Sequence, residues 1–541
     1  MMRRPARWVL VHVTLACLLL FPAGGSVAHG AGAASGSRPL RCDPGAHPER
    51  GLQGRVSAED IEGGYASDPI RCNARLVGRF GSKGIYGGSA GGFKVLRYVD
   101  SASRECAYYD STILFPMSAQ KVGHEGLGVY VMDMSNPARP VKTANLLTPA
   151  MQSPHESMSL NARRGLLVAV SNFSLNPGIL DVYDVTRDCR HPRLLSSTPL
   201  GVLGHEGNFS PDGRTYWTSS GGGFVPDGTL VAVDLSNPSV PSVVWASAQY
   251  RFHGVSLSPD GTRLYGSDLG APPVGNLHPY GLRILDVSEI QARAPNPAVR
   301  EVAFLTYEDY SLPQMSIPVT IGGRPYVIAV DEFARGLGAG DPAAPVGAVH
   351  IVDVADERHP EIVSKIDLEV HRPEHIATVA DDPGARFPEG GYAVHYCAVP
   401  RQREPRILAC SFILSGLRVF DIRRPHAPRE IAYFNAPIPP SNAAEWELNR
   451  AAPFNAAYAM SAPSFVPERG EVWYSDVTFG FFNVRLTASA LAVWNPSQAR
   501  TRTRMPSRAA RNRQAVSLPV SRLLPARYFC ALPETSAVSV Q

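Results

Sequence analysis

The sequence has little charge and, beyond its first residues, no long apolar segment. Only 18% of its 541 residues are Asp, Glu, Lys or Arg, and the formal net charge is +4. There is no basic face with interleaved aromatic residues and no nucleic-acid reader motif, so no nucleic-acid partner is expected. No segment after residue 28 stays apolar for the roughly 18 residues of a membrane-spanning helix, so no transmembrane segment is expected in the mature chain.

Several local catalytic motifs are also missing. The sequence contains neither a Walker loop nor an H-E-x-x-H zinc motif. The glycine-rich stretch "GGSAGG" at 87–92 lacks the Lys and the helix that a phosphate-binding loop needs. No two cysteines have C-x-x-C spacing, which argues against a zinc knuckle and a dithiol redox motif. A Ser/His/Asp triad stays open, because its members need not be neighbours in the sequence.

The one long apolar run lies at the N-terminus. Arg3, Arg4 and Arg7 precede "WVLVHVTLACLLLF", and small residues follow it up to Ala28. A positive flank, a short apolar stretch and a small-x-small site are typical of a cleaved signal peptide, which predicts a secreted, extracytoplasmic protein. A membrane anchor is the alternative, but this run is too short to span ~30 Å of hydrocarbon comfortably.

Cysteines are few, and in an exported chain they are disulfide candidates. Removal of the signal peptide leaves seven of the eight. Cys397 and Cys410 flank a loop between two apolar runs, which predicts a cross-strand disulfide in a hairpin. We also expect Cys42 to pair with Cys72 and so hold the N-terminal segment. The odd number leaves at least one free thiol, and we expect it to be Cys530 in the tail.

Glycine and proline are plentiful, at 48 residues each, and the chain repeats. Each copy is a β-rich run that ends in Asp, followed by one apolar residue and a polar turn with Pro, as in "GVYVMDMSNPARPV" at 128–141. We expect the Asp to cap that turn by accepting backbone N–H hydrogen bonds. A weaker seventh copy, "GFFNVRL" at 480–486, has Arg485 at this position. The six aspartates, about 50 to 70 residues apart, are Asp133, Asp184, Asp234, Asp286, Asp353 and Asp421.

Further β-rich runs between these copies give each unit about four short strands. A single four-stranded unit cannot bury both of its faces, so seven units predict an all-β fold, a seven-bladed β-propeller, which we expect to be a monomer. A right-handed β-solenoid is the alternative, but its rungs repeat over far fewer residues. The predicted boundaries are residues 1–28 for the signal peptide, 29–80 for an N-terminal extension, 81–487 for the propeller and 488–541 for a disordered basic tail.

The Asp-terminated runs also resemble a known family. The segments "GLRVFDIRRPHAP" at 416–428, "LRILDVS" at 282–288 and "VHIVDVAD" at 349–356 are similar to the motif of the LVIVD-repeat proteins, a group of secreted propellers. The resemblance covers roughly residues 80 to 487 and implies the architecture, but it implies almost nothing about activity. The seventh copy departs from the motif at Arg485, which leaves the closure of the ring less well defined than the other blades.

A histidine recurs at one position of these units. His155, His205 and His253 each stand six residues before the first position of a predicted turn, as in "GHEGNFSPDG" at 204–213. The first strand of each propeller blade lines the central channel, so equivalent residues of these strands form a ring around it. Alignment of the units extends this position to Gln314, His395 and Ser461.

Four imidazoles around one axis suit a transition metal such as copper, iron or zinc. We therefore predict His155, His205, His253 and His395 as metal ligands, with Gln314 and Ser461 as further channel-lining residues. The adjacent carboxylates Glu156 and Glu206 are candidate catalytic bases on a bound water, or outer acceptors that orient the imidazoles. The alternative is that the histidines are inherited with the repeat and only hydrogen-bond neighbouring carbonyls or channel waters.

A second resemblance concerns one of these strands. "SPHESMSLNARRGLLVAVSN" at 153–172 is similar in layout to the Pro-His strands of selenium-binding-protein-type methanethiol oxidases, which are copper-linked propellers. The resemblance implies a metal-dependent oxidoreductase.

Two functions stay open at this point. One is a secreted propeller whose channel metal supports oxidation or hydrolysis of a small-molecule substrate. The other is a non-enzymatic propeller that binds a protein, glycan or cell-wall partner through the inserted loops 333–346 and 381–391, since insertions on one face of a repeat protein often carry ligand contacts.

Overall fold

The computed structural model describes residues 40–81, 91–110, 128–152, 154–171, 178–201, 204–219, 229–270, 280–307, 312–333, 346–385, 391–440 and 456–496. Contacts divide the chain into residues 1–39 and residues 40–541, and all described residues belong to the second unit. The predicted signal peptide, Cys530 and most of loop 333–346 lie outside the described residues. Among those that are described, no helix is long and apolar enough to cross a membrane.

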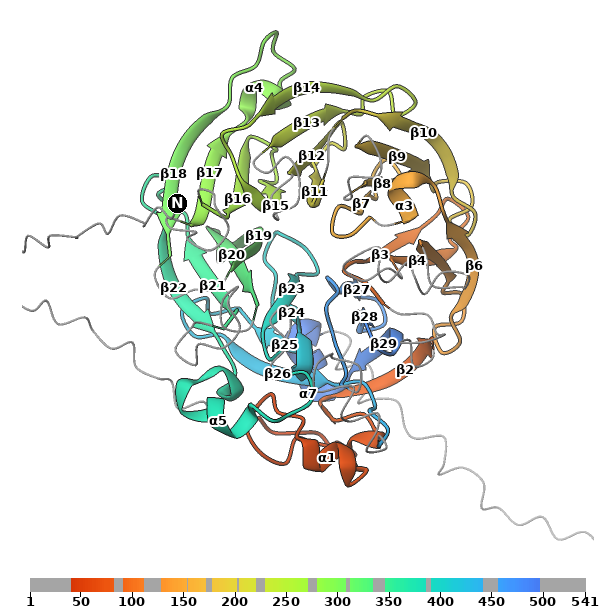
Figure 1. The fold of residues 1–541 in the computed structure, drawn as a ribbon, viewed down its shortest axis with the longest axis vertical. Helices are drawn as coiled ribbons and strands as arrows, with labels where there is room; N and C mark the ends of the chain where they lie inside the picture. Colours follow the sequence, from red (N-terminus) through yellow and green to blue (C-terminus); the bar gives the residue numbers. More distant parts are fainter. Residues whose placement is uncertain are drawn as a thin grey trace, which may run out of the picture. The chain divides into compact units, whose positions relative to one another are not determined.

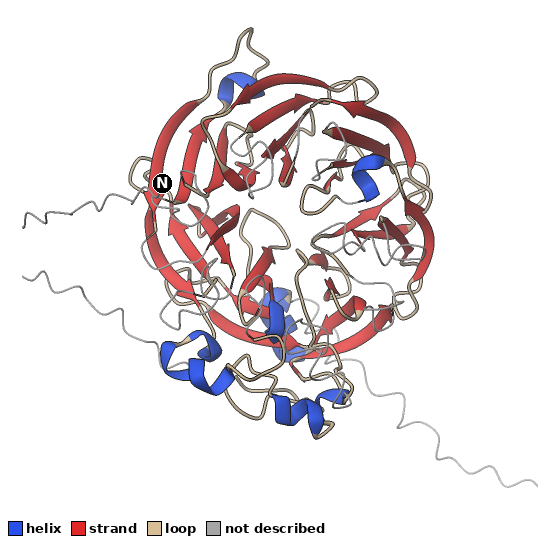
Figure 2. Ribbon diagram, viewed as in Figure 1, coloured by secondary structure: helices blue, strands red, loops and turns tan. Residues whose placement is uncertain are grey.

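Seven antiparallel sheets are arranged in a ring, which confirms the predicted seven-bladed β-propeller (Figures 1 and 2). In chain order the first four blades are β3 (Val95–Val99), β4 (Glu105–Asp110), β5 (Val129–Asp133) and β6 (Val141–Leu146); β7 (Ser159–Asn161), β8 (Leu166–Val170), β9 (Ile179–Asp184) and β10 (Arg193–Pro199); β11 (Glu206–Phe209), β12 (Thr215–Ser219), β13 (Leu230–Asp234) and β14 (Ser242–Ser247); and β15 (Phe252–Leu257), β16 (Arg263–Asp268), β17 (Gly281–Asp286) and β18 (Arg300–Thr306).

The other three blades include the two strands from the N-terminal segment. They are β19 (Leu312–Ile321), β20 (Arg324–Glu332), β21 (Val349–Asp353) and β22 (Glu361–Ile366); β23 (Val394–Ala398), β24 (Ile407–Phe412), β25 (Gly416–Asp421) and β26 (Arg429–Phe434), with β1 (Arg71–Cys72) outside; and β27 (Ser464–Val466), β28 (Glu471–Asp476) and β29 (Gly480–Leu486), with β2 (Ala74–Phe80) outside. The helices are short: α1 (Ala58–Glu62), α3 (Pro149–Gln152), α4 (Ser288–Gln291), α5 (Ile376–Val379), α7 (Ala488–Trp494), and the 3-10 turns η1 (Tyr65–Ser67), η2 (Glu369–His371), η3 (Pro373–His375) and η4 (Ile413–Ser415).

The repeated aspartates end the third strand of their blades and cap the turn that follows, as predicted. In each of the six units a side-chain oxygen of the Asp accepts the backbone N–H two residues later, at 2.8 to 3.1 Å. An Asp carboxylate can close such a turn by itself, which explains why the motif repeats with the blades. In the seventh blade Arg485 instead forms an ion pair with the buried Glu471 on the neighbouring strand.

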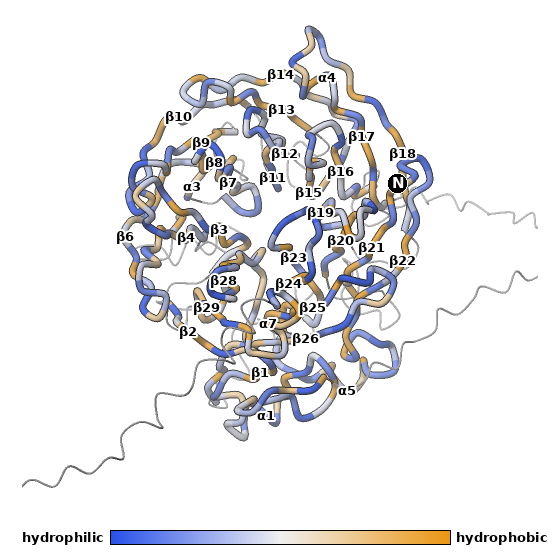
Figure 3. The backbone as a smooth tube through the Cα atoms, turned by 180° about the vertical axis from the view of Figure 1, so that it is seen from behind, coloured by the Kyte–Doolittle hydropathy of each residue, from blue (hydrophilic) through white to orange (hydrophobic). Residues whose placement is uncertain are grey.

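Burial follows the position of a strand in its blade. The second strands β8 and β12 are buried at every residue, whereas the outer strand β14 is largely exposed. Apolar residues, shown in orange, accordingly lie mainly on the strands, while the turns at the blade edges are mostly hydrophilic (Figure 3). The core is therefore the set of contacts between neighbouring blades, and each blade depends on both of its neighbours.

The ring is closed by a strand that precedes the first repeat. Strand β2 pairs antiparallel with β29, so the seventh blade takes its outer strand from residues 74–80. The predicted boundary at residue 81 placed this strand in the N-terminal extension, whereas its pairing with β29 includes residues 74–80 in the sheet of the seventh blade. The repeat motif could not show it, since β2 carries none of the Asp-turn sequence.

Regular structure also continues past the C-terminal boundary predicted at residue 487. Residues 488–494 were predicted as the start of a disordered tail, but they form α7. Its buried residues Ala490, Leu491 and Trp494 lie on one face at helical spacing, and the Trp494 ring packs on Phe465 of β27 at 5.4 Å. The remainder of the predicted tail, from residue 497, lies outside the described residues.

Residues 40–72 pack against the sixth blade. In Figure 1, α1 lies next to α5, some three hundred residues later in the chain, and the ion pair between Arg55 and Asp382 at 2.8 Å joins these two regions. The guanidinium of Arg418 on β25 is fully buried and contacts the carboxylates of both Glu49 and Glu430. This buried group fastens the N-terminal segment to the propeller.

Three disulfides join described residues. The predicted bonds Cys42–Cys72 and Cys397–Cys410 are both present, and the second links directly opposite residues of β23 and β24. A third disulfide, between Cys106 on β4 and Cys189 after β9, joins the first two blades and was not predicted. Neither cysteine lies in a shared hairpin or motif that would have indicated a pair 83 residues apart.

We expect the third disulfide to contribute more stability than the hairpin disulfide. It closes a loop of 83 residues, against 13 for Cys397–Cys410. Loop-closure entropy then predicts a loss of about 4.5 kcal/mol in the free energy of unfolding for Cys106→Ala with Cys189→Ala, and about 3 kcal/mol for Cys397→Ala with Cys410→Ala. Denaturant unfolding of the two double variants measures both values. A larger loss in the hairpin variant would contradict this order.

Candidate metal centre

The four predicted histidines come together at the channel ends of the inner strands. His253 and His395 lie on β15 and β23, and His205 directly precedes β11. His155 lies four residues ahead of β7, in a turn with a φ of 49°. A non-glycine residue in this left-handed region is unusual, and such conformations cluster at functional sites.

Two of the imidazoles are fixed by backbone carbonyls. Nδ1 of His253 donates to the carbonyl oxygen of Gln314 at 3.0 Å, and Nδ1 of His395 donates to that of Met460 at 2.7 Å. A carbonyl oxygen can only accept, so in the neutral ring the proton is on Nδ1 and the lone pair of Nε2 faces the cluster. This is the orientation in which a histidine ligates a metal.

The carboxylate of Glu156 contacts the imidazoles around it. Its Oε2 lies 3.1 Å from Nε2 of His205, 3.5 Å from Nε2 of His253 and 3.9 Å from Nε2 of His155. Its Oε1 lies 3.2 Å from Nε2 of His395. Glu156 therefore faces the same nitrogens that a metal would bind, and it does not orient the rings from outside through Nδ1.

A second carboxylate, Glu332, belongs to the cluster and was missed in the sequence. Its Oε1 lies 3.1 Å from Nε2 of His253, and its Oε2 lies 3.0 Å from Nε2 of His395. Glu332 ends β20, opposite Leu312 and thus close to the start of the inner strand β19. A signal was present in the sequence: the second strands of several units end in an acidic residue, as at Asp110, Asp268 and Asp476.

The imidazole rings also pack on one another. Nε2 of His205 lies 2.9 Å from Nε2 of His253, and the ring of His155 lies 4.5 Å from that of His205. Phe93, fully buried in the first blade, contacts the rings of His155 and His395 at 4.5 and 5.4 Å. His205 is the most exposed member, with 15% of its side chain accessible, so solvent approaches the cluster beside it.

Charges in the cluster shift the pKa values in opposite directions. Burial alone would lower the pKa of His253 and His395, but their contacts with Glu156 and Glu332 raise it to about 9 and about 10. Burial would raise the pKa of the two carboxyl groups, but the neighbouring imidazoles hold it below the usual range. Two imidazolium groups thus balance two carboxylates, and a cation that binds here must displace their protons.

The other two histidines stay neutral. Burial, reinforced by the nearby ring of His205, lowers the pKa of His155 to about 3. Burial and then the charge of His253 also lower the pKa of His205. Neutral imidazole is the form that ligates a metal, so these two side chains need no proton transfer before binding.

Glu206 occupies the position of Glu156 in the next blade but has different partners. The two residues form an isolated parallel bridge, and Oε1 of Glu206 accepts from Nζ of Lys94 at 3.0 Å. A Cβ atom at Gly254 would come within 1.8 Å of Oε2 of Glu206, so this glycine makes room for the carboxylate. Burial raises the pKa of Glu206 to about 7 although the ammonium of Lys94 opposes the shift.

Of the two predicted channel residues, one joins the cluster. Nε2 of Gln314 donates to Oε1 of Glu156 at 2.8 Å. Ser461 is buried, but its hydroxyl accepts the backbone N–H of Ser475 at 2.7 Å, and its carbonyl accepts from the hydroxyl of Ser411. Ser461 therefore connects strands of its own and the neighbouring blade.

The donor set fits a divalent transition metal. Two groups within it, His155 with Glu156 and His205, and Glu156 with His253 and Glu332, bring their ligand atoms within 4.8 Å of one another. Adjacent ligands on one ion with bonds of about 2.1 Å are about 3 Å apart, close to most of the N–O distances above. Oε1 of Gln314 is buried without a hydrogen-bond partner, and Oε2 of Glu156 has only the imidazole contacts given above. A cation between these atoms would satisfy them.

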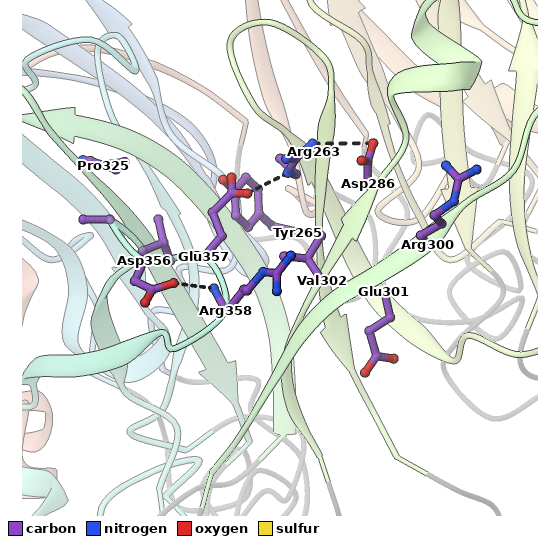
Figure 4. Close-up of a pocket in the computed structure, with 12 residues that line it drawn as sticks. Arg263, Tyr265, Asp286, Arg300, Glu301, Val302, Pro325, Asp356, Glu357 and Arg358 are labelled. Carbon is purple, nitrogen blue, oxygen red and sulfur yellow. Dashed lines mark hydrogen bonds and ion pairs between the residues drawn. The ribbon is translucent and has the colours of Figure 1, made fainter.

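A groove of about 910 Å³ lies elsewhere, between the fourth and fifth blades (Figure 4). Arg263 crosses it, 2.8 Å from Glu357 and 3.5 Å from Asp286. Arg300 and Arg358 also line this groove, whereas none of the histidines of the cluster does. Its charges are of both signs and partly paired, so it is a candidate surface for binding.

Comparison with known proteins finds only distant structural similarities. No protein-family profile matches the chain, and no curated protein matches its sequence. Among solved structures, hydrazine synthase of Kuenenia stuttgartiensis is 13% identical, with 74% of this chain and 96% of that chain covered at a TM-score of 0.43. The β-propeller domain of Swd1 from Myceliophteria thermophila is 10% identical, with 76% and 98% covered at 0.43. A 6-phosphogluconolactonase-like protein of Bacteroides uniformis is 14% identical, with 67% and 94% covered at 0.40.

Proposed function

We propose that this protein is a secreted β-propeller that binds a transition metal in its channel and uses it to oxidise or hydrolyse a small-molecule substrate. The observation that carries the proposal is the meeting of four imidazole Nε2 atoms and two carboxylates, all from different blades or strands, in one buried cluster. Groups of this kind are costly to bury, and they are concentrated at functional sites.

The alternative, that the histidines are purely structural, explains the contacts of only one of the two nitrogen atoms in each ring. For His253 and His395 the hydrogen bond to a neighbouring carbonyl uses Nδ1, as that alternative requires. Their Nε2 atoms point at carboxylates instead of carbonyls, and packing of the blades does not need such contacts. A role for the cluster beyond packing is therefore favoured.

The donor atoms also limit which metal ions can bind. Imidazole nitrogen with carboxylate oxygen suits zinc, iron or divalent copper, and no thiolate or thioether belongs to the described cluster. When bound, such an ion acts as a Lewis acid and lowers the pKa of a coordinated water. Glu206 is the candidate acid–base residue, because its Oε2 has no hydrogen-bond partner and it does not contact the imidazole Nε2 atoms.

Two further parts of the proposal concern the location of the protein and the family to which it belongs. Three disulfides among the described residues support export to an oxidising compartment, as expected after a signal peptide. The repeated Asp-capped turns support membership of the LVIVD-repeat group. The resemblance to the copper-linked methanethiol oxidases adds copper to the metals to be tested.

Combined replacement of His205 and His253 by Ala should abolish metal binding. These two Nε2 atoms are 2.9 Å apart, so the variant loses two adjacent ligands of one ion. We expect untagged wild-type protein, expressed with metal supplied, to contain bound metal by elemental analysis, and the double variant to contain less than about a tenth of it.

The matched control is the pair His191→Ala with His359→Ala. These imidazoles are 64% and 79% exposed, and each contacts an Asp three residues earlier, outside the cluster. The control should keep its metal. Well-folded wild-type protein without metal, after expression in metal-rich medium, would contradict the proposal.

The second candidate function, binding without catalysis, is favoured by the charged groove between the fourth and fifth blades. It would stand if metal-free, folded protein bound a glycan or cell-wall fraction and lost that binding on Arg300→Glu with Arg358→Glu. The inserted loops, where this function was first expected, lie partly outside the described residues: 334–345 and 386–390.

A further inference from the structure

The cluster has more donor atoms than one transition-metal ion uses. Four imidazole nitrogens and the four oxygens of Glu156 and Glu332 give eight donors, whereas such ions take about four to six ligands. Calcium accepts up to about eight ligands, but it prefers oxygen and does not explain the imidazoles. The number of donors therefore raises the question of how many ions the cluster holds.

The two carboxylates divide their oxygens in the same way. For Glu332, Oε1 faces His253 and Oε2 faces His395, at 3.1 and 3.0 Å. For Glu156, Oε2 faces His253 and Oε1 faces His395, at 3.5 and 3.2 Å. Each carboxylate thus offers one oxygen to each of two separate places, which is how a carboxylate bridges two metal ions.

We propose that the cluster holds two divalent ions, bridged by the carboxylates of Glu156 and Glu332. This inference rests on the proposed metal-binding function and adds the number and arrangement of the ions. The first place, beside His253, is where Oε2 of Glu156 and Oε1 of Glu332 converge. The second place, beside His395, is where the other two oxygens converge.

The remaining donors are shared unequally between the two places. His205 belongs to the first, because its Nε2 is 2.9 Å from that of His253 and 3.1 Å from Oε2 of Glu156. His155 approaches the same oxygen at 3.9 Å. The nearest donors of the first ion are therefore two imidazoles and two carboxylate oxygens, with His155 further away, and positions stay open for water or substrate.

The second ion has fewer protein ligands. His395 and two carboxylate oxygens supply three. Gln314 lies beside them, with its Nε2 2.8 Å from Oε1 of Glu156 and 3.5 Å from Nε2 of His395, and its Oε1 is buried without a partner. Rotation of this amide by half a turn would present the oxygen to the ion, since amide oxygen and nitrogen are interchangeable in shape. The second ion is accordingly the more weakly held one.

A single ion has one arrangement that competes with this. It would sit between His253 and His395 and be chelated by both carboxylates, with two imidazoles and four oxygens as its ligands. His205 and His155 would then have no metal to bind, although Nε2 of His205 lies as close to Glu156 as that of His395 does. The two arrangements differ in the number of ions and in the effect of removing Glu332.

Metal stoichiometry tests the inference. Metal-free protein would be titrated with Zn²⁺, and with Mn²⁺ for electron paramagnetic resonance, after removal of loosely bound ions by gel filtration. We expect two ions per wild-type chain, and a spin-coupled signal for the pair of Mn²⁺ ions. Glu332→Gln should retain one ion, because the place beside His205 and His253 keeps most of its ligands. Glu361→Gln, an exposed glutamate on β22, should retain two.

The outcomes separate this inference from the proposed function. One ion in the wild-type chain would overturn the two-ion centre and leave the metal-binding function intact. No ion would overturn both. Two ions retained in Glu332→Gln would overturn the bridging role of that carboxylate. Thermal unfolding of each chain confirms that a loss of metal does not come from a loss of fold.

Discussion

A chain that begins at residue 81 will not form a closed propeller, whereas a chain that begins at residue 40 will. The shorter chain lacks β2, the outer strand of the seventh blade, and so exposes the edge of β29. It also lacks the segment that packs on the sixth blade. Without β2, no strand joins the two ends of the chain in one sheet, and the ring is held closed only by contacts between the first and seventh blades, such as the backbone hydrogen bond from Val95 to Ala462.

A chain that begins at residue 73 separates the two effects. It keeps β2 but loses Cys42, Cys72 and the contact of Glu49 with Arg418. We expect it to fold, with a free energy of unfolding lower by up to about 3–5 kcal/mol, because Arg418 keeps Glu430 as a partner. The chain from residue 81 should show no cooperative unfolding by circular dichroism. Equal stability of the chains from 73 and 81 would show that β2 does not close the ring.

This closing strand marks the limit of what the repeat could reveal. Each Asp-capped turn is a local feature, so the sequence alone was enough to predict seven units and their order. The pairing of β2 with β29 joins residues about four hundred positions apart, and neither strand carries the motif. The disulfide Cys106–Cys189 was missed for the same reason, whereas Cys397–Cys410 lies within a hairpin and was predicted.

The residues of the candidate site were likewise predicted only where they occupy a repeated position. The histidines were found because they occupy one repeated position, and repeated positions converge in a ring. Glu332 was missed because it comes from a second strand and reaches the cluster only through the register of β20 on β19. Ser461 occupies the same repeated position, but its hydrogen bonds join it to Ser475 and Ser411. The repeat therefore determines where a residue lies, and its side chain determines whether it can bind a metal.

Glu156 and Glu206 show that equivalent positions can differ in role. They stand one residue after His155 and His205, and the two blades meet between them in a parallel bridge. Oε2 of Glu156 is shared among imidazoles, whereas Oε1 of Glu206 is paired with Lys94. One carboxylate therefore belongs to the ligands, and the other lies beside them.

Replacement of Glu156 by Gln should consequently weaken metal binding by about 100-fold or more. Its carboxylate approaches Nε2 of all four histidines, so no single histidine variant removes as many contacts. Changes to groups that only orient a ligand already cost about 10–100-fold in affinity, and loss of a charged ligand should cost at least as much. Competition with a chelator of known affinity, at fixed pH, measures the change.

Glu206→Gln is the matched control, since it makes the same substitution at the equivalent position of the next blade. We expect this variant to retain its metal, because Glu206 contacts Lys94 and none of the imidazole Nε2 atoms. Any effect on turnover of a substrate would then come from the loss of an acid–base group and not from loss of the ion. If both variants lost metal equally, binding would depend on the negative charge of the channel as a whole. If neither did, Glu156 would not be a ligand, and the imidazoles alone would have to hold the ion.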